Sequence, residues 1–290
     1  MIVDAHVHLY PPELNAEPAR WAAEHQEPHW AELCTRRRKN GSPVQGFPSV
    51  EALLRAMDAA GVARTVLQGW YWQRPENCAA QNRFFAACVR AHPDRLSAFA
   101  TVHPAAGVDA VLAEMQRARD EGLIGLGELS PHSQDYDVAD AIFAAMIEQA
   151  GEWRWPVNLH VTDPESGDYP GKVETPLRDF VWLARAYTQT NFILAHWGGL
   201  LPLRELEGEE LLNVFYDTAA SPLLYDATIW TRFLEAVPAG RVLFGSDFPL
   251  NVYPKLDAEP GMTRLLEEAR AHGADAAVLG ENARKLLNLR

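Results

Sequence analysis

Short runs of apolar, β-branched residues alternate with longer stretches of helical periodicity along the whole chain. Short apolar runs between turn residues are typical of buried parallel strands. The longer stretches predict helices, and those over 50–60 and 108–121 are followed by Gly61 and Gly122, residues that readily adopt the conformation that ends a helix. We predict eight strands, at residues 2–8, 64–69, 96–102, 123–129, 157–160, 191–196, 214–217 and 242–246.

Eight strand–helix units indicate the α/β class and a (β/α)8 TIM barrel. A doubly wound open sheet is the structural alternative. The eightfold count favours the barrel, as does the spread of candidate site residues over the whole chain. With 290 residues, the chain has the size of one α/β barrel domain over residues 1–290.

Two segments are longer than ordinary connections between a strand and a helix, namely residues 10–47 and 161–175. Each follows a predicted strand, so each is expected over the catalytic face of a barrel. We interpret residues 10–47 as an insertion that forms a lid. The basic run "RRRK" at 36–39 within it indicates a solvated helix face or a contact with an acidic partner.

The composition narrows the function classes. Apolar residues make up 48% of the chain and charged residues 22%, as in soluble globular proteins, and no apolar run is long enough to span a membrane. The first predicted strand begins at Ile2, which leaves no room for a signal peptide and favours a cytoplasmic location. A net charge of −13 disfavours nucleic acid as a partner and leaves a small-molecule substrate. Assembly into a homo-oligomer stays open.

Histidines and one aspartate stand at the predicted strand ends. His6 and His8 share one face of the first strand, because alternate strand residues point to the same side. His160, His196 and Asp247 end the fifth, sixth and eighth strands. Each of the last three alone would be as typical of a capping or buried polar residue as of a ligand. Together with the His-x-His pair they predict a divalent metal site, and imidazole with carboxylate suits zinc.

Zinc lowers the pKa of a bound water to about 7, so a hydroxide nucleophile is available at neutral pH. Asp247 would bind the metal and accept the proton of that water. Glu128 ends the fourth strand in "GLGELS". It predicts either a carboxylate that bridges a second ion or a buried carboxylate paired with an arginine or a backbone donor. The sequence supports the two equally, and one or two ions are expected.

Aromatic and basic residues follow several of these strands and are candidates for the substrate pocket. The second strand ends in "GWYWQR", and aromatic walls with a cation suit a cyclic or aromatic carboxylate. For each aromatic residue, packing at the rim of the barrel is an equal alternative. The candidates for substrate binding are Trp70, Tyr71, Trp72, Arg74, His103, Lys172 and Trp197.

The phrases "DAHVHL", "ILAHWGG", "VFYDTAASP", "VLFGSDFP" and "GENARKLLNL" resemble the amidohydrolase superfamily. Within it the chain is similar to the amidohydrolase-related (amidohydrolase-2) family, which includes aminocarboxymuconate semialdehyde decarboxylase-like proteins. The resemblance covers essentially the whole chain except residues 10–47. It implies a metal-dependent barrel enzyme with ligands on the first, fifth, sixth and eighth strands.

The same resemblance bears on the number of ions. With one ion, His6, His8, His160 and Asp247 would bind it and His196 would act as a catalytic acid or base. A carboxylate on the fourth strand usually accompanies two ions, and Glu128 supplies one here, as in the TatD-like hydrolases. The acidic net charge argues against the nuclease activity of that group.

Three functions remain. The leading hypothesis is a hydrolase of a small, cyclic or aromatic, carboxylate-bearing amide, lactone or ester that uses a metal-bound hydroxide. The alternative is a non-oxidative, metal-dependent decarboxylase of an aromatic or muconate-like acid. A catalytically inactive binding protein ranks last, because none of the five core ligand positions is substituted.

Overall fold

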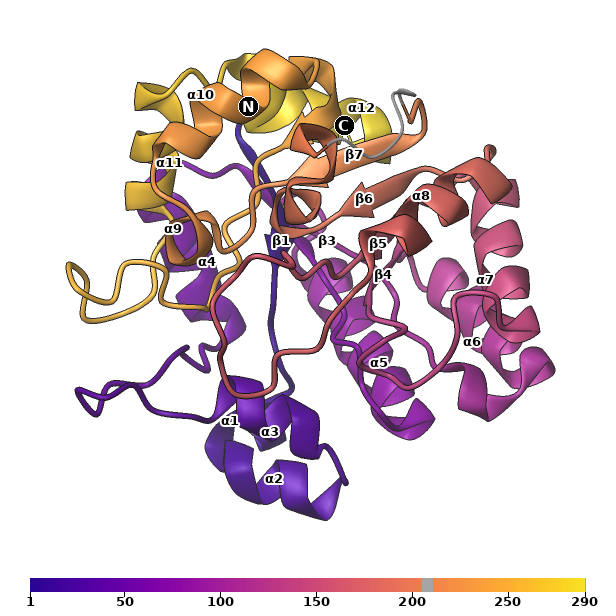
Figure 1. Ribbon diagram of the computed structural model, residues 1–290. Coiled ribbons are helices and arrows are strands. Elements are labelled where there is room, and N and C mark those ends of the chain that lie inside the picture. Colours follow the sequence, from indigo (N-terminus) through magenta and orange to yellow (C-terminus); the bar gives the residue numbers. More distant parts are fainter. Residues whose placement is uncertain (205–210, 290) are drawn as a thin grey trace.

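The computed structural model describes residues 1–204 and 211–289, and in this part of the chain each predicted strand contains an observed one (Figure 1). Seven of these strands are shorter than predicted, and β7 has the predicted bounds. The strands are β1 (Val3–Val7), β2 (Arg64–Leu67), β3 (Leu96–Ala98), β4 (Leu126–Leu129), β5 (Val157–Leu159), β6 (Phe192–Leu194), β7 (Val214–Asp217) and β8 (Val242–Leu243).

All the ladders are parallel, and they close into a barrel. Strands β1 to β3 form one sheet and β4 to β8 form another. The two sheets meet at parallel bridges, one between Ala100 and Leu126 and one between Val7 and Phe248. The Ala5 amide also donates to the Phe244 carbonyl at 2.8 Å. The predicted (β/α)8 barrel is confirmed, and the open sheet is not observed.

Helices surround the barrel, and the helices predicted to end before Gly61 and Gly122 do end beside these glycines. Helix α4 begins after Ser49, whose hydroxyl accepts from the Ala52 amide, and ends at Gly61 with a φ of 70°. The longer helices are α4 (Val50–Ala60), α5 (Pro75–Ala91), α6 (Val108–Asp120), α7 (Ala141–Glu152), α8 (Leu177–Ala186), α10 (Thr228–Ala236) and α11 (Thr263–Ala271). Shorter helical segments are η1 (Pro104–Ala106), η2 (His196–Leu203), α9 (Ser221–Leu224), η3 (Ala239–Arg241), η4 (Ala277–Glu281) and α12 (Asn282–Leu287).

The insertion after β1 contains three short helices, α1 (Pro12–Ala16), α2 (Pro18–Glu24) and α3 (Pro28–Cys34). Each begins with a proline, which fits the first turn of a helix because that turn needs no amide donor. The helices pack on an aromatic cluster that includes Trp30 and Trp72. This cluster is separate from the main barrel core. Figure 1 shows this indigo part of the chain beyond the end of β1.

The insertion also contacts other connections on this side of the barrel. The His29 ring nitrogen Nε2 donates to the Gly171 carbonyl at 2.9 Å, which joins α3 to the segment after β5. The Gly46 amide donates to Pro249, which follows β8. The two long segments predicted from the sequence therefore meet each other.

One glycine sets how closely β8 approaches β1. A Cβ atom at Gly245 would lie 2.8 Å from the Cβ of His6, closer than side-chain atoms pack. Glycine at this position lets the two strands come together and brings the residues after β8 next to His6 and His8.

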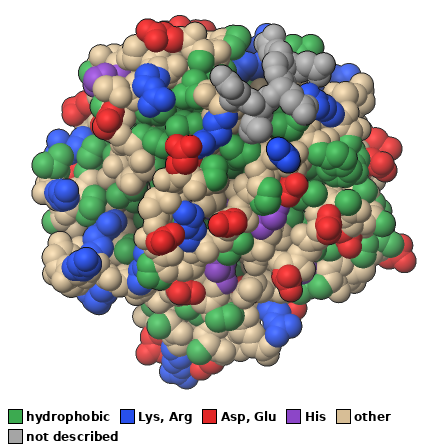
Figure 2. Space-filling view, in the orientation of Figure 1, with side chains coloured by type: hydrophobic (Ala, Val, Ile, Leu, Met, Phe, Trp, Pro, Cys, Tyr) green, Lys and Arg blue, Asp and Glu red, His purple; other side chains and the backbone are tan. Residues whose placement is uncertain are grey.

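Acidic and basic side chains are interspersed on the face in Figure 2, which carries no continuous basic surface. No helix in residues 1–204 and 211–289 is both long and apolar enough to cross a membrane.

Candidate metal centre

His6 and His8 lie together inside the barrel, as the strand periodicity predicts. His6 is fully buried and His8 is 4% exposed. Their Nε2 atoms are 3.1 Å apart, and the His8 Nδ1 atom lies 3.2 Å from the Gln68 carbonyl. Both rings therefore turn Nε2 toward the same point.

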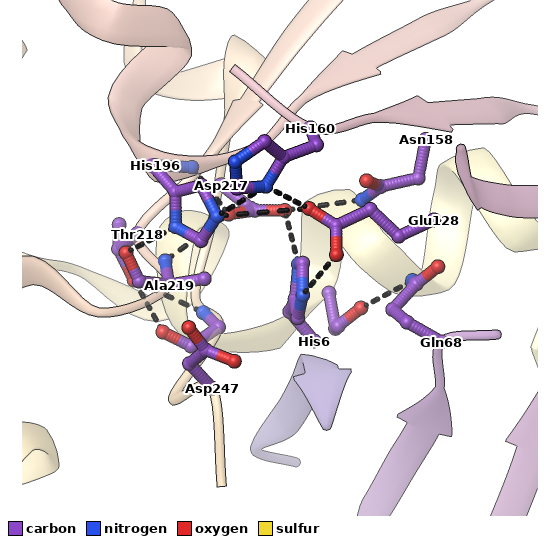
Figure 3. A network of polar contacts seen from close by, with 12 residues as sticks. His6, Gln68, Glu128, Asn158, His160, His196, Asp217, Thr218, Ala219 and Asp247 are labelled. Atoms are coloured by element: carbon purple, nitrogen blue, oxygen red, sulfur yellow. Dashed lines mark hydrogen bonds and ion pairs between the residues drawn. The ribbon is translucent and has the colours of Figure 1, made fainter. Parts of the chain in front are cut away.

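Glu128 lies between His6 on one side and a second histidine pair, His160 and His196, on the other (Figure 3). Its Oε2 atom lies 3.7 Å from His6 Nε2 and 3.6 Å from His8 Nε2. Its Oε1 atom lies 3.0 Å from His160 Nδ1 and 3.6 Å from His196 Nε2. Two clusters of potential metal ligands, each with ligand atoms within 4.8 Å of one another, thus share this carboxylate.

Asp247 borders the first cluster. Its Oδ1 atom lies 3.5 Å from His8 Nε2, and its amide donates to the His6 carbonyl at 2.9 Å. The residue has a φ of 63°, in the left-handed region, which is uncommon for a residue other than glycine. We call His6, His8, Glu128, His160, His196 and Asp247 the histidine–carboxylate centre.

Burial and charge act in opposite directions on the carboxylates of the centre. Burial favours the neutral acid at Glu128, but His160 and His6 outweigh it and hold the pKa of Glu128 well below its usual range. At Asp247 burial prevails over His6 and His196 and raises the pKa to about 6. Both carboxylates are therefore ionised at neutral pH, the form that binds a cation.

The four histidines of the centre divide into two with a lowered pKa and two with a raised pKa. Burial lowers the pKa of His8 to about 3 and also lowers the pKa of His160. Burial opposes charge at His6, but Asp217 and Glu128 outweigh it and raise its pKa to about 10. The bond to Glu128 likewise outweighs burial at His196 and raises its pKa to about 9.

The donor set fits a divalent transition-metal ion. Four imidazoles and two ionised carboxylates converge in a buried space, and imidazole nitrogens together with carboxylate oxygens are typical ligands of such ions. Ligation requires unprotonated imidazole, so a bound ion would take the place of the protons on His6 and His196.

The sequence comparison identifies the family. The family model described as amidohydrolase (Amidohydro_2) matches residues 3–289. The chain belongs to this amidohydrolase family. Among proteins of curated function, none has a sequence that matches this chain.

Solved structures similar to this amidohydrolase include decarboxylases. 5-Carboxyvanillate decarboxylase from Sphingomonas paucimobilis has 16% identity and a TM-score of 0.74, with 100% of this chain and 99% of that chain covered. 2,6-Dihydroxybenzoate decarboxylase from Rhizobium has 18% identity and a TM-score of 0.66, with 99% and 98% covered.

A third similar structure contains a metal. The 5-carboxyvanillate decarboxylase from Novosphingobium aromaticivorans was solved with manganese and 4-hydroxy-3-methoxy-5-nitrobenzoic acid. It has 14% identity and a TM-score of 0.73, and the match covers 100% of this chain and 96% of that chain. At these identities the likeness concerns the fold.

The end of β2 places two aromatic residues of this amidohydrolase beside the centre. The Trp70 ring centroid lies 5.4 Å from that of His8. The Tyr71 ring stacks on Trp70 at 4.4 Å and lies 5.1 Å from the ring of His160. These two of the predicted pocket residues adjoin candidate ligands.

Two other predicted aromatic residues lie in hydrophobic cores. The Trp72 Nε1 atom donates to Gln81 at 2.7 Å, and the ring packs in the aromatic cluster of the insertion. The Trp197 ring packs against Trp230 and Phe233, with centroids 4.9 and 4.8 Å away. The contacts of both side chains are those of packed core residues, which was the alternative to substrate binding in the sequence-based prediction.

The three polar candidates have partners outside the histidine–carboxylate centre. Arg74 is exposed and bonds Gln26. The His103 ring lies 3.1 Å from the Gln134 carbonyl. Lys172 Nζ donates to the Ser166 carbonyl at 2.7 Å.

Asp217 ends β7 as predicted, but the sequence assigned it no role in the site. Its Oδ2 atom lies 2.8 Å from His6 Nδ1, and it is fully buried. The available signal was its position at the end of a predicted strand, but nothing in the sequence showed which side chain it faces.

Proposed function

We propose that this amidohydrolase is a metal-dependent hydrolase of a small, cyclic or aromatic amide, lactone or ester that bears a carboxylate. The observation that carries the proposal is the position of Glu128. It turns one oxygen toward His6 and His8 and the other toward His160 and His196. A carboxylate between two pairs of nitrogen ligands suits a pair of divalent ions, an arrangement that many hydrolytic enzymes use.

Two zinc ions are the proposed cofactor. His6, His8 and Asp247 would hold one, His160 and His196 the other, and Glu128 would bind both. The ions would supply Lewis acidity and lower the pKa of a coordinated water.

The residues of the chain would carry out the proton transfer. Asp247 lies at the edge of the centre, 3.5 Å from His8, where its carboxylate would accept a proton from the coordinated water and return it to the leaving group. Trp70 and Tyr71 would form the wall on which a planar substrate packs. Residues 10–47 and 161–175 would cover the bound substrate and exclude water.

Decarboxylation of an aromatic acid is the second candidate. It is favoured by the similar structures of aromatic-acid decarboxylases and by His196, whose raised pKa of about 9 keeps it protonated at neutral pH. If one ion is bound and His196 is not a ligand, this imidazolium would be the acid that protonates the ring carbon as carbon dioxide leaves.

The two reactions are distinguished by the origin of the oxygen in the product. We would incubate the zinc-loaded protein in ¹⁸O-labelled water with aryl lactones, amides and esters and with hydroxybenzoic acids. Hydrolysis places one ¹⁸O atom in the new carboxylate, whereas decarboxylation releases carbon dioxide and leaves a product without the label. Carbon dioxide release with no labelled product would contradict the hydrolase proposal.

A further inference from the structure

We propose that Asp217 is a positioning residue that orients one histidine of each cluster, His6 and His196, with Nε2 toward Glu128. This inference rests on the proposed metal centre, because it concerns which nitrogen of each ring is presented to an ion. Asp217 itself has no free oxygen for an ion.

Four donors occupy the Asp217 carboxylate, which is fully buried. Its Oδ2 atom lies 2.8 Å from His6 Nδ1 and accepts from Asn158 Nδ2 at 3.1 Å. Its Oδ1 atom accepts from the backbone amides of His196 at 3.1 Å and Ala219 at 3.0 Å. These contacts fix the carboxylate in one orientation, between residues of β1 and β5 and residues that follow β6 and β7 (Figure 3).

The first effect is on His6. A carboxylate can only accept, so the His6 Nδ1 atom must carry the proton of this bond. The other nitrogen, Nε2, then faces His8 Nε2 and Glu128 Oε2. An acceptor that holds the far nitrogen of a ligand histidine fixes its tautomer and its ring orientation.

The second effect, on His196, passes through the backbone. Asp217 holds the Ala219 amide, and the Ala219 carbonyl lies 3.1 Å from His196 Nδ1. His196 has a φ of 58°, an unfavourable conformation for a side chain of this size, and its own amide bonds Asp217. Asp217 thereby stabilises both the turn that carries His196 and the ring orientation that points Nε2 toward Glu128.

Asp217→Asn tests this role because the amide has only one oxygen for four donors. Whichever way it turns, its NH₂ group faces either His6 and Asn158 or the two backbone amides. If it faces His6, the imidazole must move its proton to Nε2, the nitrogen that an ion needs. We would measure zinc affinity of the metal-stripped proteins by competition with a chelator, and thermal unfolding of the same samples.

We expect Asp217→Asn to bind zinc at least about tenfold more weakly than the parent, the usual range for such a partner of a ligand histidine. Asn158→Ala is the matched control, since it removes another donor to the same oxygen and leaves the His6 contact. We expect it to bind zinc within about threefold of the parent. Parent-like affinity in Asp217→Asn, or an equal loss in both variants, would overturn the proposal.

A measurement on the parent keeps the test independent of the variant's folding. In zinc-loaded protein with ¹⁵N-labelled histidine, the His6 signals, assigned by their loss in His6→Gln, should show a proton on Nδ1 and the metal on Nε2. Metal on Nδ1 would overturn the positioning role. Hydrolysis need not occur for either measurement, and a parent that binds no zinc would instead contradict the proposed function.

Discussion

At the scale of single residues, two buried carboxylates with different surroundings define the centre. The Glu128 oxygens face the ring nitrogens of four histidines, whereas the Asp217 oxygens are occupied by four donors. Glu128 is therefore the one of the two that has capacity to bind ions, and its removal should change how many ions are held.

Glu128→Gln should lower the metal content from about two ions per chain to about one, because the amide offers one oxygen and no charge to two cations. Elemental analysis of dialysed, zinc-loaded protein gives the stoichiometry. A parent with one ion and an unchanged variant would make Glu128 a structural or supporting residue, and would leave His196 available as an acid.

Asp247→Asn should separate binding from turnover. The amide keeps the size of the side chain and one oxygen donor but cannot accept a proton. We expect kcat to fall by about 100-fold or more, with KM changed much less. Steady-state kinetics with metal content measured on the same sample provides the check, and near-normal kcat with metal retained would refute the proton-transfer role.

Metal binding should strengthen as the pH rises. The pKa of His6 is raised to about 10 and that of His196 to about 9, so at pH 7 both rings carry a proton that an ion must displace. Apparent zinc affinity should therefore increase between pH 6 and 9, by about tenfold per pH unit for each proton displaced, with protons released on binding. Affinity that is flat over this range, with no proton release, would show that neither histidine becomes a ligand.

At the scale of elements, local sequence patterns predicted the strands, whereas the substrate-pocket residues stay a prediction. Apolar runs and glycine positions identify a strand or a helix end from its own residues, as at Gly61. Neighbours within one run face opposite ways, however, and which way depends on contacts with distant segments. Trp70, Tyr71 and Trp72 all belong to the aromatic cluster of the insertion, and of these Trp70 also lies beside His8 and Tyr71 beside His160. Trp197 likewise turns toward α10, which the sequence around it does not reveal.

The contact between α3 and the segment after β5 should depend on Gly171. Its φ is +78°, and an added Cβ would lie 2.8 Å from Leu33. Gly171→Ala should therefore loosen both segments, so that limited proteolysis cuts 10–47 and 161–175 faster while zinc content stays the same.

The matched control for that change is Gly167→Ala in the same segment, where an added Cβ meets no atom within 4 Å. It should be cut at the parent rate. If Gly171→Ala and the parent are cut by the protease at equal rates, the two segments are not held together at this contact.

At the scale of the whole molecule, barrel closure is what brings the centre together. His6 and Asp247 are far apart in sequence, yet the Asp247 amide bonds the His6 carbonyl because β8 lies beside β1. The strand-end positions of the histidines and Asp247 allowed this grouping to be predicted from the sequence. For Glu128 the sequence left two alternatives, a carboxylate shared by two ions or a buried paired one, because the choice depends on how side chains from different strands meet inside the barrel.

The most direct test of the account is the metal content of the parent and of the His6→Ala/His8→Ala double variant. Both proteins would be loaded with zinc, dialysed and analysed for metal, with circular dichroism to establish that the barrel is folded. We expect about two ions per chain in the parent, as in the proposed function, and loss of metal and of all activity in a folded double variant. A folded double variant that keeps the full metal content of the parent would contradict it.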